Sequence, residues 1–304
     1  MTLHAIVAAL GGDLHQGGCR ANVPAPGHSS SDRSVSLLLS EGRVVIHGFG
    51  AADWRLMLDW LRECGLVDAG GRLLMDVTST PMPAVVRPDP MTRRDTALRL
   101  WEGGVPLAAG GISDHHLGHR CIDGGRRALS LRHHPAAPIS VYRAGSRTRP
   151  ALMARISDAD GRLTAVELTY LEPNGRRAAG LRLSRKTVGH VPAGAAVRLA
   201  PAARDMLVGE GVATTLSAID RFQLPGWALM SAHNLAAWTP PPGVRSVLVA
   251  ADRGRVGEAA AATLRRRLTS GGLAVRVVWP DPPFGDWNDA VVAAARAERK
   301  EEGR

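Results

Sequence analysis

The hydrophobic pattern is most regular in the last third of the chain, where short apolar runs alternate with amphipathic segments. The apolar runs have the length of buried strands and cover residues 206–210, 227–232, 246–252 and 273–279. The segments that follow them have helical spacing and cover residues 211–220, 258–270 and 286–297. Strands and helices that alternate in this way predict an α/β fold, with a mostly parallel sheet that helices cover on both faces.

The first two thirds of the chain have a more mixed pattern, so the whole chain is expected to be α+β. A short helix is expected at 7–12. Strands at 34–39 and 42–49 are expected to form a hairpin that turns at Ser40–Gly42. Asp53 is expected to cap a helix over 54–66. Further on, helices are predicted at 92–101 and 113–118, and strands at 151–158, 163–171 and 196–200. Prolines and glycines between 69 and 92 indicate a linker. The predicted parts are a first domain 1–68, a linker 69–92, a middle region 93–203, and a C-terminal domain 204–304 whose charged tail from Ala297 is expected to fray.

Composition narrows the class of protein. The 304 residues suffice for about two domains, and the net charge of +10 with a pI of about 10.9 favours a polyanionic partner. The alternative is an arginine-rich but merely solvated surface. Three unpatterned cysteines give no disulfide framework, which fits a reducing cytoplasm. We find no apolar run of about 18 residues and no signal peptide, so a membrane protein is not expected.

Acidic residues follow the predicted strands of the C-terminal domain. Glu210 follows the first strand, Asp252 ends a later one, and Asp286 and Asp289 come after the last. Because the carboxyl ends of parallel strands share one edge of a sheet, these carboxylates are expected to meet there. Such a group can hold Mg²⁺ or Mn²⁺ for phosphoryl chemistry. The alternative for each acid alone is the cap of the helix that follows it.

The same residues carry a family resemblance. LVGEGVATTLSAI, SVLVAADRGRVGEAAAATLRRRL and PFGDWNDAV resemble, in this order, the Toprim domain of phage and mobile-element primases. The resemblance implies that Glu210 is a general acid or base, that Asp252 is a catalytic metal ligand, and that Asp286 and Asp289 support the metal. One position departs from the family pattern, because Gly254 replaces a second aspartate. Arg253 and Arg255 flank this glycine and are expected to contact nucleic acid.

A second resemblance lies near the N-terminus. Residues 23–28, 32–37, 45–49 and 53–54 resemble a primase zinc ribbon, but the four ligand positions hold Ala25, His28, Gly48 and Ala52. A structural zinc site needs four nitrogen or sulfur ligands, so no zinc is expected. Trp54, Leu56 and Trp60 are candidates for a core that replaces the metal. Arg33 is either a nucleic-acid contact or a surface side chain without a partner.

Two further groups carry candidate chemistry. Arg185 and Lys186, in the segment SRKTVGH, are expected to bind nucleic acid, with a solvated basic face as the alternative. The segment DHHLGHRC, residues 114–121, is either a metal site or a structural helix before a turn at 131–135.

The resemblances together imply a primase-like nucleotidyltransferase of a plasmid, phage or other mobile element. Its partners would be single-stranded DNA, nucleoside triphosphates and a replicative helicase. A nucleic-acid-binding remnant without catalysis and a Toprim nuclease are the alternatives.

Overall fold

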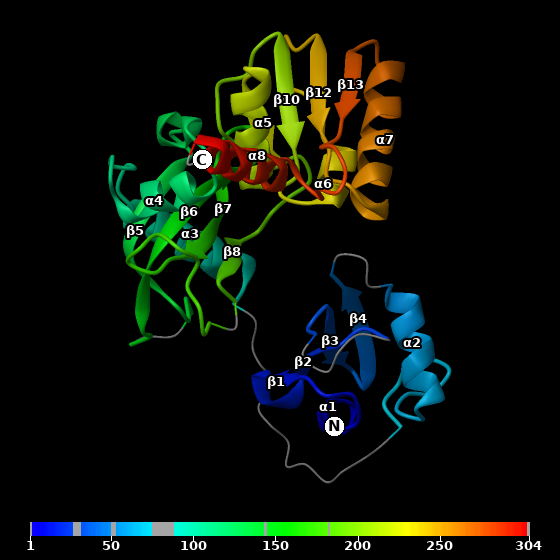
Figure 1. Cartoon of the computed structure of the whole chain (residues 1–304). Helices are drawn as coiled ribbons and strands as arrows, with labels where there is room; N and C mark the ends of the chain where they lie inside the picture. The colour runs from blue at the N-terminus through cyan, green and yellow to red at the C-terminus, as the bar shows by residue number, and fades with distance from the viewer. Residues whose placement is uncertain are drawn as a thin grey trace. The chain divides into compact units, whose positions relative to one another are not determined.

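The structure is a computed structural model, and it describes residues 2–26, 32–49, 53–74, 88–142, 145–181 and 183–302. The chain divides into two compact units, Met1–Arg87 and Pro88–Arg304, and each is described by itself (Figure 1). In neither unit does a described helix have the length and apolar character needed to cross a membrane.

The first unit is an antiparallel sheet packed against helices. The elements in chain order are α1 (His4–Leu10), β1 (Asp13–His15), η1 (Gln16–Gly18), β2 (Arg20–Val23), β3 (Val35–Ser40), β4 (Arg43–Gly48) and α2 (Trp54–Glu63). The strands pair in the order β1-β2-β3-β4. The predicted hairpin is confirmed: Glu41 and Gly42 both have positive φ, as a two-residue turn of the favoured hairpin type requires.

The core of the first unit differs from the predicted one. Trp54 and Leu56 are 46% and 63% exposed, so the expectation that they replace a metal core is wrong. Met57 and Leu61 are fully buried instead, because residues four apart share the helix face that meets the sheet. Only Trp60 of the three predicted residues packs against this core. Asp53 caps α2, as predicted, by accepting a hydrogen bond from the Arg55 amide.

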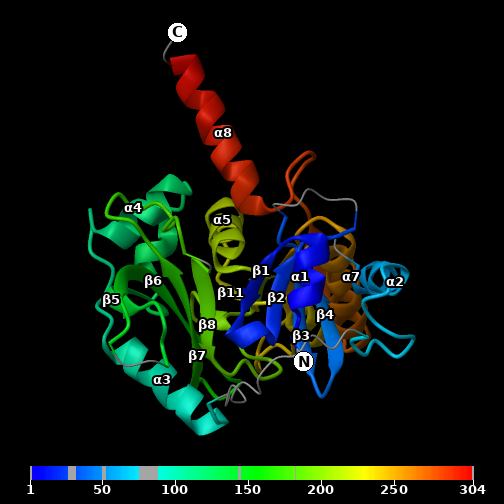
Figure 2. The same cartoon turned by 90° about the horizontal axis from the view of Figure 1, so that it is seen from below.

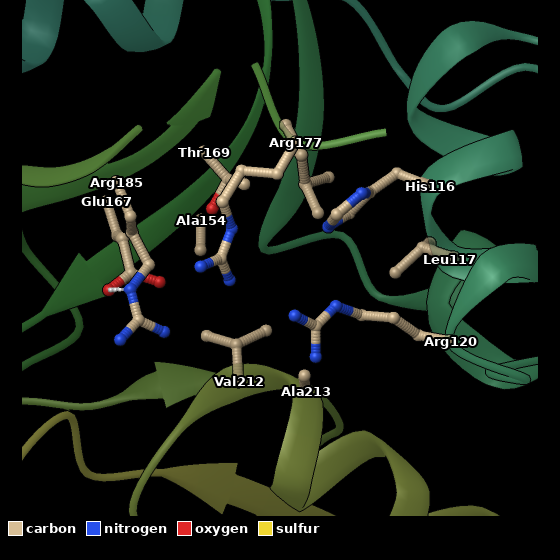
Figure 3. A pocket seen from close by; sticks show the side chains of 11 residues that line it. His116, Leu117, Arg120, Ala154, Glu167, Thr169, Arg177, Arg185, Val212 and Ala213 are labelled. Carbon is tan, nitrogen blue, oxygen red and sulfur yellow. Dashed lines mark ion pairs between the residues drawn. The ribbon is translucent and has the colours of Figure 1, made fainter. Parts of the chain in front are cut away.

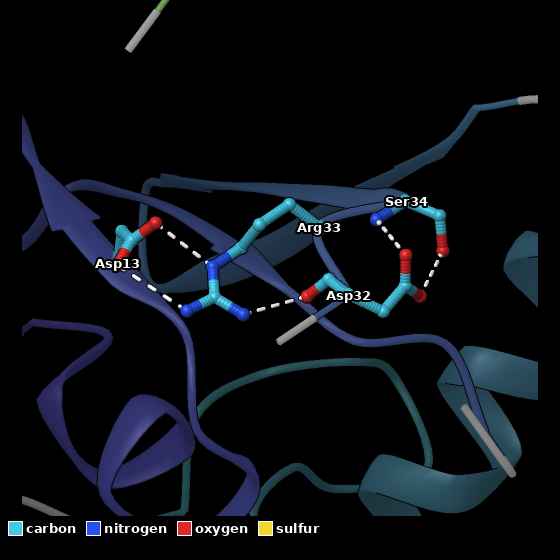
Figure 4. A network of polar contacts seen from close by, with 4 residues as sticks. All are labelled: Asp13, Asp32, Arg33 and Ser34. Carbon is cyan, nitrogen blue, oxygen red and sulfur yellow. Dashed lines mark hydrogen bonds and ion pairs between the residues drawn. The ribbon is translucent and has the colours of Figure 1, made fainter. Parts of the chain in front are cut away.

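Arg33 holds two segments of the first unit together (Figure 4). Its guanidinium donates to Asp13 at 2.8 Å and to the backbone carbonyl of Asp32 at 2.7 Å, and the Asp32 carboxylate accepts from the Ser34 amide and hydroxyl. The interpretation of Arg33 as a surface side chain without a partner is therefore wrong. The projected zinc positions 28 and 52, and most of the predicted linker, lie outside the described residues.

We expect the first unit to keep its folded state when zinc is removed, because buried apolar side chains form its core. Treating the purified chain with a zinc-selective chelator, in the presence of Mg²⁺, should leave its thermal unfolding transitions unchanged within about 1 °C. Calorimetry with parallel metal analysis measures this, and stoichiometric zinc or a chelator-sensitive transition would contradict it.

The second unit contains two sheets. Its first part consists of α3 (Pro90–Glu102), α4 (Ile112–His119), η2 (Gly124–Arg127), β5 (Leu131–Pro138), β6 (Thr148–Ser157), β7 (Leu163–Tyr170), β8 (Arg185–Gly189) and β9 (Val197–Arg198). Strands β5-β6-β7-β8 form an antiparallel sheet in that order. The expected turn at 131–135 is wrong, because these residues lie in β5, which pairs with β6.

The second part of this unit has the predicted alternation of strands and helices. Its elements are β10 (Asp205–Gly209), α5 (Val212–Phe222), β11 (Gly226–Ala228), α6 (Ala232–Ala237), β12 (Ser246–Ala250), α7 (Arg255–Ser270), β13 (Ala274–Val278) and α8 (Trp287–Glu302). The sheet order is β13-β12-β10-β11-β9, and all pairs are parallel except β11 with β9. The edge strand β9 thus comes from the predicted middle region.

Helices cover both faces of this sheet, so the α/β prediction is confirmed. Leu207, Leu248 and Ala250 pack with α5 and with Trp287 of α8, whereas Met206, Val208, Val247 and Val249 pack with α6 and α7. Neighbouring residues along a strand face opposite sides, which explains this division. Figure 2 shows α8 leading away from α5 toward the C-terminus.

Helix α8 is longer than expected. The expectation that the chain frays from Ala297 is wrong up to Glu302. The first turns of α8 are capped by Asp286 and pack on α5. Once these turns exist, each further residue adds a hydrogen bond at little cost, because nucleation is the expensive step.

Candidate metal and phosphate site

The carboxyl ends of three parallel strands lie at the same level. Gly209 of β10 pairs with Ala250 of β12, which pairs with Val278 of β13. Glu210 follows β10 directly, Asp252 follows β12 after one residue, and a loop leads from β13 to Asp286. Gly209 is required at this edge, because a Cβ there would lie 2.5 Å from the Thr215 hydroxyl of α5.

Asp252 is the centre of the acidic group. Burial, and then the charges of Glu210, Asp286 and Asp289, raise the pKa of Asp252 to about 7. The structure therefore brings the other three predicted acids within electrostatic reach of Asp252. Within the described part of the chain, the buried Oδ1 of Asp252 has no hydrogen-bond partner.

The four acids have different local partners. Burial also raises the pKa of Glu210, against the opposing effects of a hydrogen bond from the Ala232 amide and of nearby Arg185. Asp286 caps α8, since its Oδ1 accepts from the Asp289 amide at 2.8 Å. Asp289 lies exposed in the first turn of that helix. The helix-cap alternative thus describes Asp286, and the metal role that the resemblance implies for it would use its remaining lone pairs.

Asp252 does not cap the helix that follows it. Gly254 is the N-cap residue of α7, and the Glu258 carboxylate accepts from the Gly254 amide at 3.2 Å. The backbone of Gly254 has φ +105°, a conformation that side-chain-bearing residues rarely adopt. An aspartate at this position would therefore strain the loop, in addition to supplying a carboxylate.

The acidic edge fits a Mg²⁺ ion that keeps much of its water. No group of three or more histidine, cysteine, aspartate or glutamate side chains among the described residues is arranged as a complete metal cage. Mg²⁺ does not require one, because it is commonly held by one or two carboxylates together with water and phosphate oxygens. The buried Asp252 oxygen without a hydrogen-bond partner could serve as one such ligand, and the charges of Glu210 and Asp286 act on it.

Arg253 and Arg255 lie beside this edge in different ways. The Arg253 side chain donates to the Pro280 carbonyl at 2.6 Å, and its amide donates to the Gly285 carbonyl at 2.8 Å. Arg253 therefore fixes the loop that leads to Asp286. Arg255 begins α7 and is exposed.

A basic pocket lies in the same unit (Figure 3). It has a volume of about 50 Å³ and is lined by His116, Leu117, Arg120, Leu152, Ala154, Glu167, Thr169, Arg177, Arg185, Val212 and Ala213. Three guanidinium groups face one carboxylate here, and Arg185 and Glu167 are 3.9 Å apart. Burial and the charges of Arg120 and Arg185 lower the pKa of Arg177. A water needs roughly 10–15 Å³ by this measure, so the pocket has room for about one phosphate group.

The pocket is also adjacent to the acidic edge. Val212 and Ala213 form the first turn of α5, which starts immediately after Glu210 and Gly211. The amides of a first helical turn add partial positive charge. Arg185 lines the pocket, and its charge also opposes the rise in the pKa of Glu210, so one arginine interacts electrostatically with both groups. An anion in the pocket would lie next to the carboxylates.

The sequence predicted a nucleic-acid contact at Arg185, which lines this pocket, but it gave no such role to Arg120, Arg177 or His116. His116 belongs to the segment DHHLGHRC, and its Nδ1 donates to the Gly175 carbonyl at 2.8 Å. Burial lowers the pKa of His116 to about 4, so the ring is neutral at pH 7. His119 likewise contacts the Asn174 carbonyl. These contacts favour the structural-helix alternative for this segment.

Lys186 lies on the opposite side of β8 from Arg185. Its ammonium donates to the Ile139 carbonyl and lies 5.1 Å from the centre of the Tyr170 ring. The structure thus brings Arg185, but not Lys186, to the pocket.

Two family models match parts of this chain. The family model of the Toprim domain (Toprim_3) matches residues 205–297, and a domain of unknown function (DUF7146) matches residues 91–199. No curated protein matches the chain significantly.

Solved structures of primases match between 67% and 99% of this chain. The primase fragment of the bacteriophage T7 primase-helicase protein is 16% identical, with 92% of this chain and 97% of that chain covered and a TM-score of 0.40. The Aquifex aeolicus primase, with its zinc-binding and RNA polymerase domains, is 12% identical, with 99% and 82% covered and a TM-score of 0.47. The RNA polymerase domain of Mycobacterium tuberculosis primase DnaG is 14% identical, with 67% and 80% covered and a TM-score of 0.40.

The strand order, the acids at the strand ends and the family match lead to one conclusion. Residues 205–297 of this chain form a Toprim domain.

Proposed function

We propose that the chain is a primase-like nucleotidyltransferase that joins nucleotides on a single-stranded DNA template. The observation that carries this proposal is the adjacency of two opposite charges: a carboxylate edge fit for Mg²⁺ or Mn²⁺ and a basic pocket fit for phosphate. Both lie around the start of α5, at residues 210–213. A polymerising site needs this pair, because it must bind a triphosphate and also neutralise charge at the reacting phosphorus.

The roles of the chain's own residues follow from their environments. Arg120, Arg177 and Arg185 would bind one phosphate group of the triphosphate in the pocket, and would neutralise charge on the pyrophosphate as it leaves. Glu210, whose pKa is raised by burial, would take the proton of the attacking 3′-hydroxyl. Asp252 and Asp286 would hold the cation, with Asp289 supporting the same edge. When bound, the cation supplies charge neutralisation at the transferring phosphoryl group.

The net charge of +10 suits a nucleic-acid partner, and Arg253 and Arg255, which follow Asp252 closely in the chain, are both exposed. We place the boundary of the Toprim domain near residue 204, before β10, although the edge strand β9 of the same sheet precedes this point. A mobile-element replication system in the cytoplasm, with a replicative helicase as partner, is the setting that we propose.

Primer synthesis tests the proposal. The full chain, incubated with single-stranded DNA, labelled nucleoside triphosphates and Mg²⁺ or Mn²⁺, is expected to make short template-dependent products. Cleavage of the template without synthesis would support a nuclease. Binding with neither activity, over a range of both metals, would reject both enzymatic functions and leave the nucleic-acid-binding remnant.

Glu210→Gln is expected to lower the rate of primer synthesis by about 10²–10³-fold, because it removes the proton acceptor while keeping the shape of the side chain. Single-turnover synthesis with saturating nucleotide measures the chemical step. Asp289→Asn, which changes an exposed carboxylate at the same edge, is the matched comparison and should cost at most about tenfold. Equal losses in the two variants would contradict the assignment of Glu210 as the base.

A further inference from the structure

Asn288 connects the acidic edge with the basic pocket. It lies in the first turn of α8, between Asp286 and Asp289, and its side chain is 2% exposed. Arg120, which ends α4 168 residues earlier, donates from Nη1 to Asn288 Oδ1 at 2.7 Å. In return, Asn288 Nδ2 donates to the Arg120 carbonyl at 2.8 Å and to the Ser217 hydroxyl of α5 at 3.0 Å.

The chemistry of the partners fixes the orientation of this amide. A guanidinium only donates and a backbone carbonyl only accepts, so the oxygen of Asn288 must face the Arg120 side chain and the nitrogen its carbonyl. The carbonyl of Arg120 is one of those left without a partner inside helix α4. The Asn288 side-chain amide thus hydrogen-bonds both the Arg120 carbonyl at the end of α4 and the Arg120 guanidinium.

The restrained guanidinium is one of the three that line the basic pocket (Figure 3). A free arginine samples many rotamers, and binding an anion would require ordering of that side chain. The hydrogen bond to a neutral amide orders Arg120 without cancelling its charge, whereas a carboxylate partner would cancel it. Arg185 shows the contrast, since it pairs with Glu167.

We propose that Asn288 is a positioning residue that holds Arg120 ready for a phosphate group in the basic pocket, and so ties the first turn of α8 to phosphate binding. The inference rests on the proposed function only in assuming that the pocket takes phosphate. A shift of Asp286 or Asp289 on cation binding would move Asn288 with them, because all three lie in or directly before one helical turn. The hydrogen bonds between Asn288 and Arg120 would then connect the acidic edge with the basic pocket.

A double-mutant cycle tests this inference with inorganic tripolyphosphate as the probe, by calorimetric titration of the full chain in metal-free buffer. Asn288→Ala is expected to weaken tripolyphosphate binding about tenfold, and Arg120→Ala by at least as much. In the Arg120→Ala background, Asn288→Ala should change the affinity less than twofold, because its effect passes through Arg120. The inference would be overturned if the double variant lost affinity by the product of the two single-variant losses. It would also be overturned if Asn288→Ala bound tripolyphosphate within twofold of the unaltered chain.

Two further variants separate positioning from loss of structure. Ser217→Ala removes one of the hydrogen bonds of Asn288 but leaves its contact with Arg120, so binding should stay within twofold even where the unfolding temperature falls. Asn288→Ser gives a smaller perturbation for the same cycle if Asn288→Ala does not fold. This test does not depend on primer synthesis. If the chain makes no primers but its two substitutions are coupled in tripolyphosphate binding, the inference is supported and the proposed function is rejected. If the chain makes primers but the effects of the two substitutions are independent, only the inference is rejected.

Discussion

Asp252→Asn is expected to make the metal-free protein more stable while it abolishes metal-dependent activity. The unfolded chain ionises Asp252 near the ordinary aspartate pKa of 3.8, but the folded chain keeps the proton up to a pKa of about 7. Between these values the folded state binds more protons, so the free energy of unfolding falls as pH rises. A pKa shift of this size corresponds to a loss of at most ~4 kcal/mol in the free energy of unfolding at high pH. Because Asp252 is partly exposed, we expect a loss of about 2 kcal/mol.

Unfolding of the second unit at several pH values measures this effect. At pH 8 without divalent metal, Asp252→Asn should unfold about 4–8 °C above the unaltered chain, and near pH 4 the two should coincide. Adding Mn²⁺ should stabilise the unaltered chain but not the variant, and primer synthesis by the variant should fall by at least about 10²-fold. Asp205→Asn, at the start of β10, is the control for a carboxylate remote from this edge. A variant less stable at pH 8, or one that still responds to Mn²⁺, would contradict Asp252 as the metal ligand.

Gly254→Asp is expected to have two opposed effects, because it adds a carboxylate at a backbone position that suits glycine. The φ of +105° should make any side chain there costly by about 1–3 kcal/mol. The space around a Cβ at this position is open, so among the described residues no clash adds to the backbone strain. The added carboxylate should still tighten Mn²⁺ binding about tenfold once the backbone cost is taken into account.

Gly254→Ala isolates the backbone cost, since it adds a Cβ without a charge. The difference between the aspartate and alanine variants in Mn²⁺ affinity, measured by electron paramagnetic resonance, reports the carboxylate alone. If the two variants bind Mn²⁺ equally, position 254 lies out of reach of the cation. In that case the glycine belongs to a differently arranged site and not to a Toprim site that has lost one ligand.

Much of the fold could be predicted because its signals are local. Strand-length apolar runs such as 246–252, and leucines four residues apart such as Leu264 and Leu268, specify β12 and α7 without reference to the rest of the chain. Weak local signals were missed or misjudged: β1, with three residues, was not predicted, β11 has three residues where a strand of six was expected, and β5 begins with two histidines and a proline among its first five residues. Pairing with a neighbouring strand makes these segments β-structure, and pairing is not visible along one sequence.

The sequence alone determined which acids follow the strands, because the alternation of strand-like and helical segments along the chain places Glu210, Asp252 and Asp286 there. Only the tertiary structure decided what surrounds them. It showed that Asp252 is buried and crowded by like charges, that Gly254 occupies a backbone conformation suited to glycine, and that Asn288 contacts Arg120 across 168 residues. The physical reason is that secondary structure follows from neighbouring residues, whereas burial, charge and hydrogen bonding depend on distances between groups that the chain brings together only on folding.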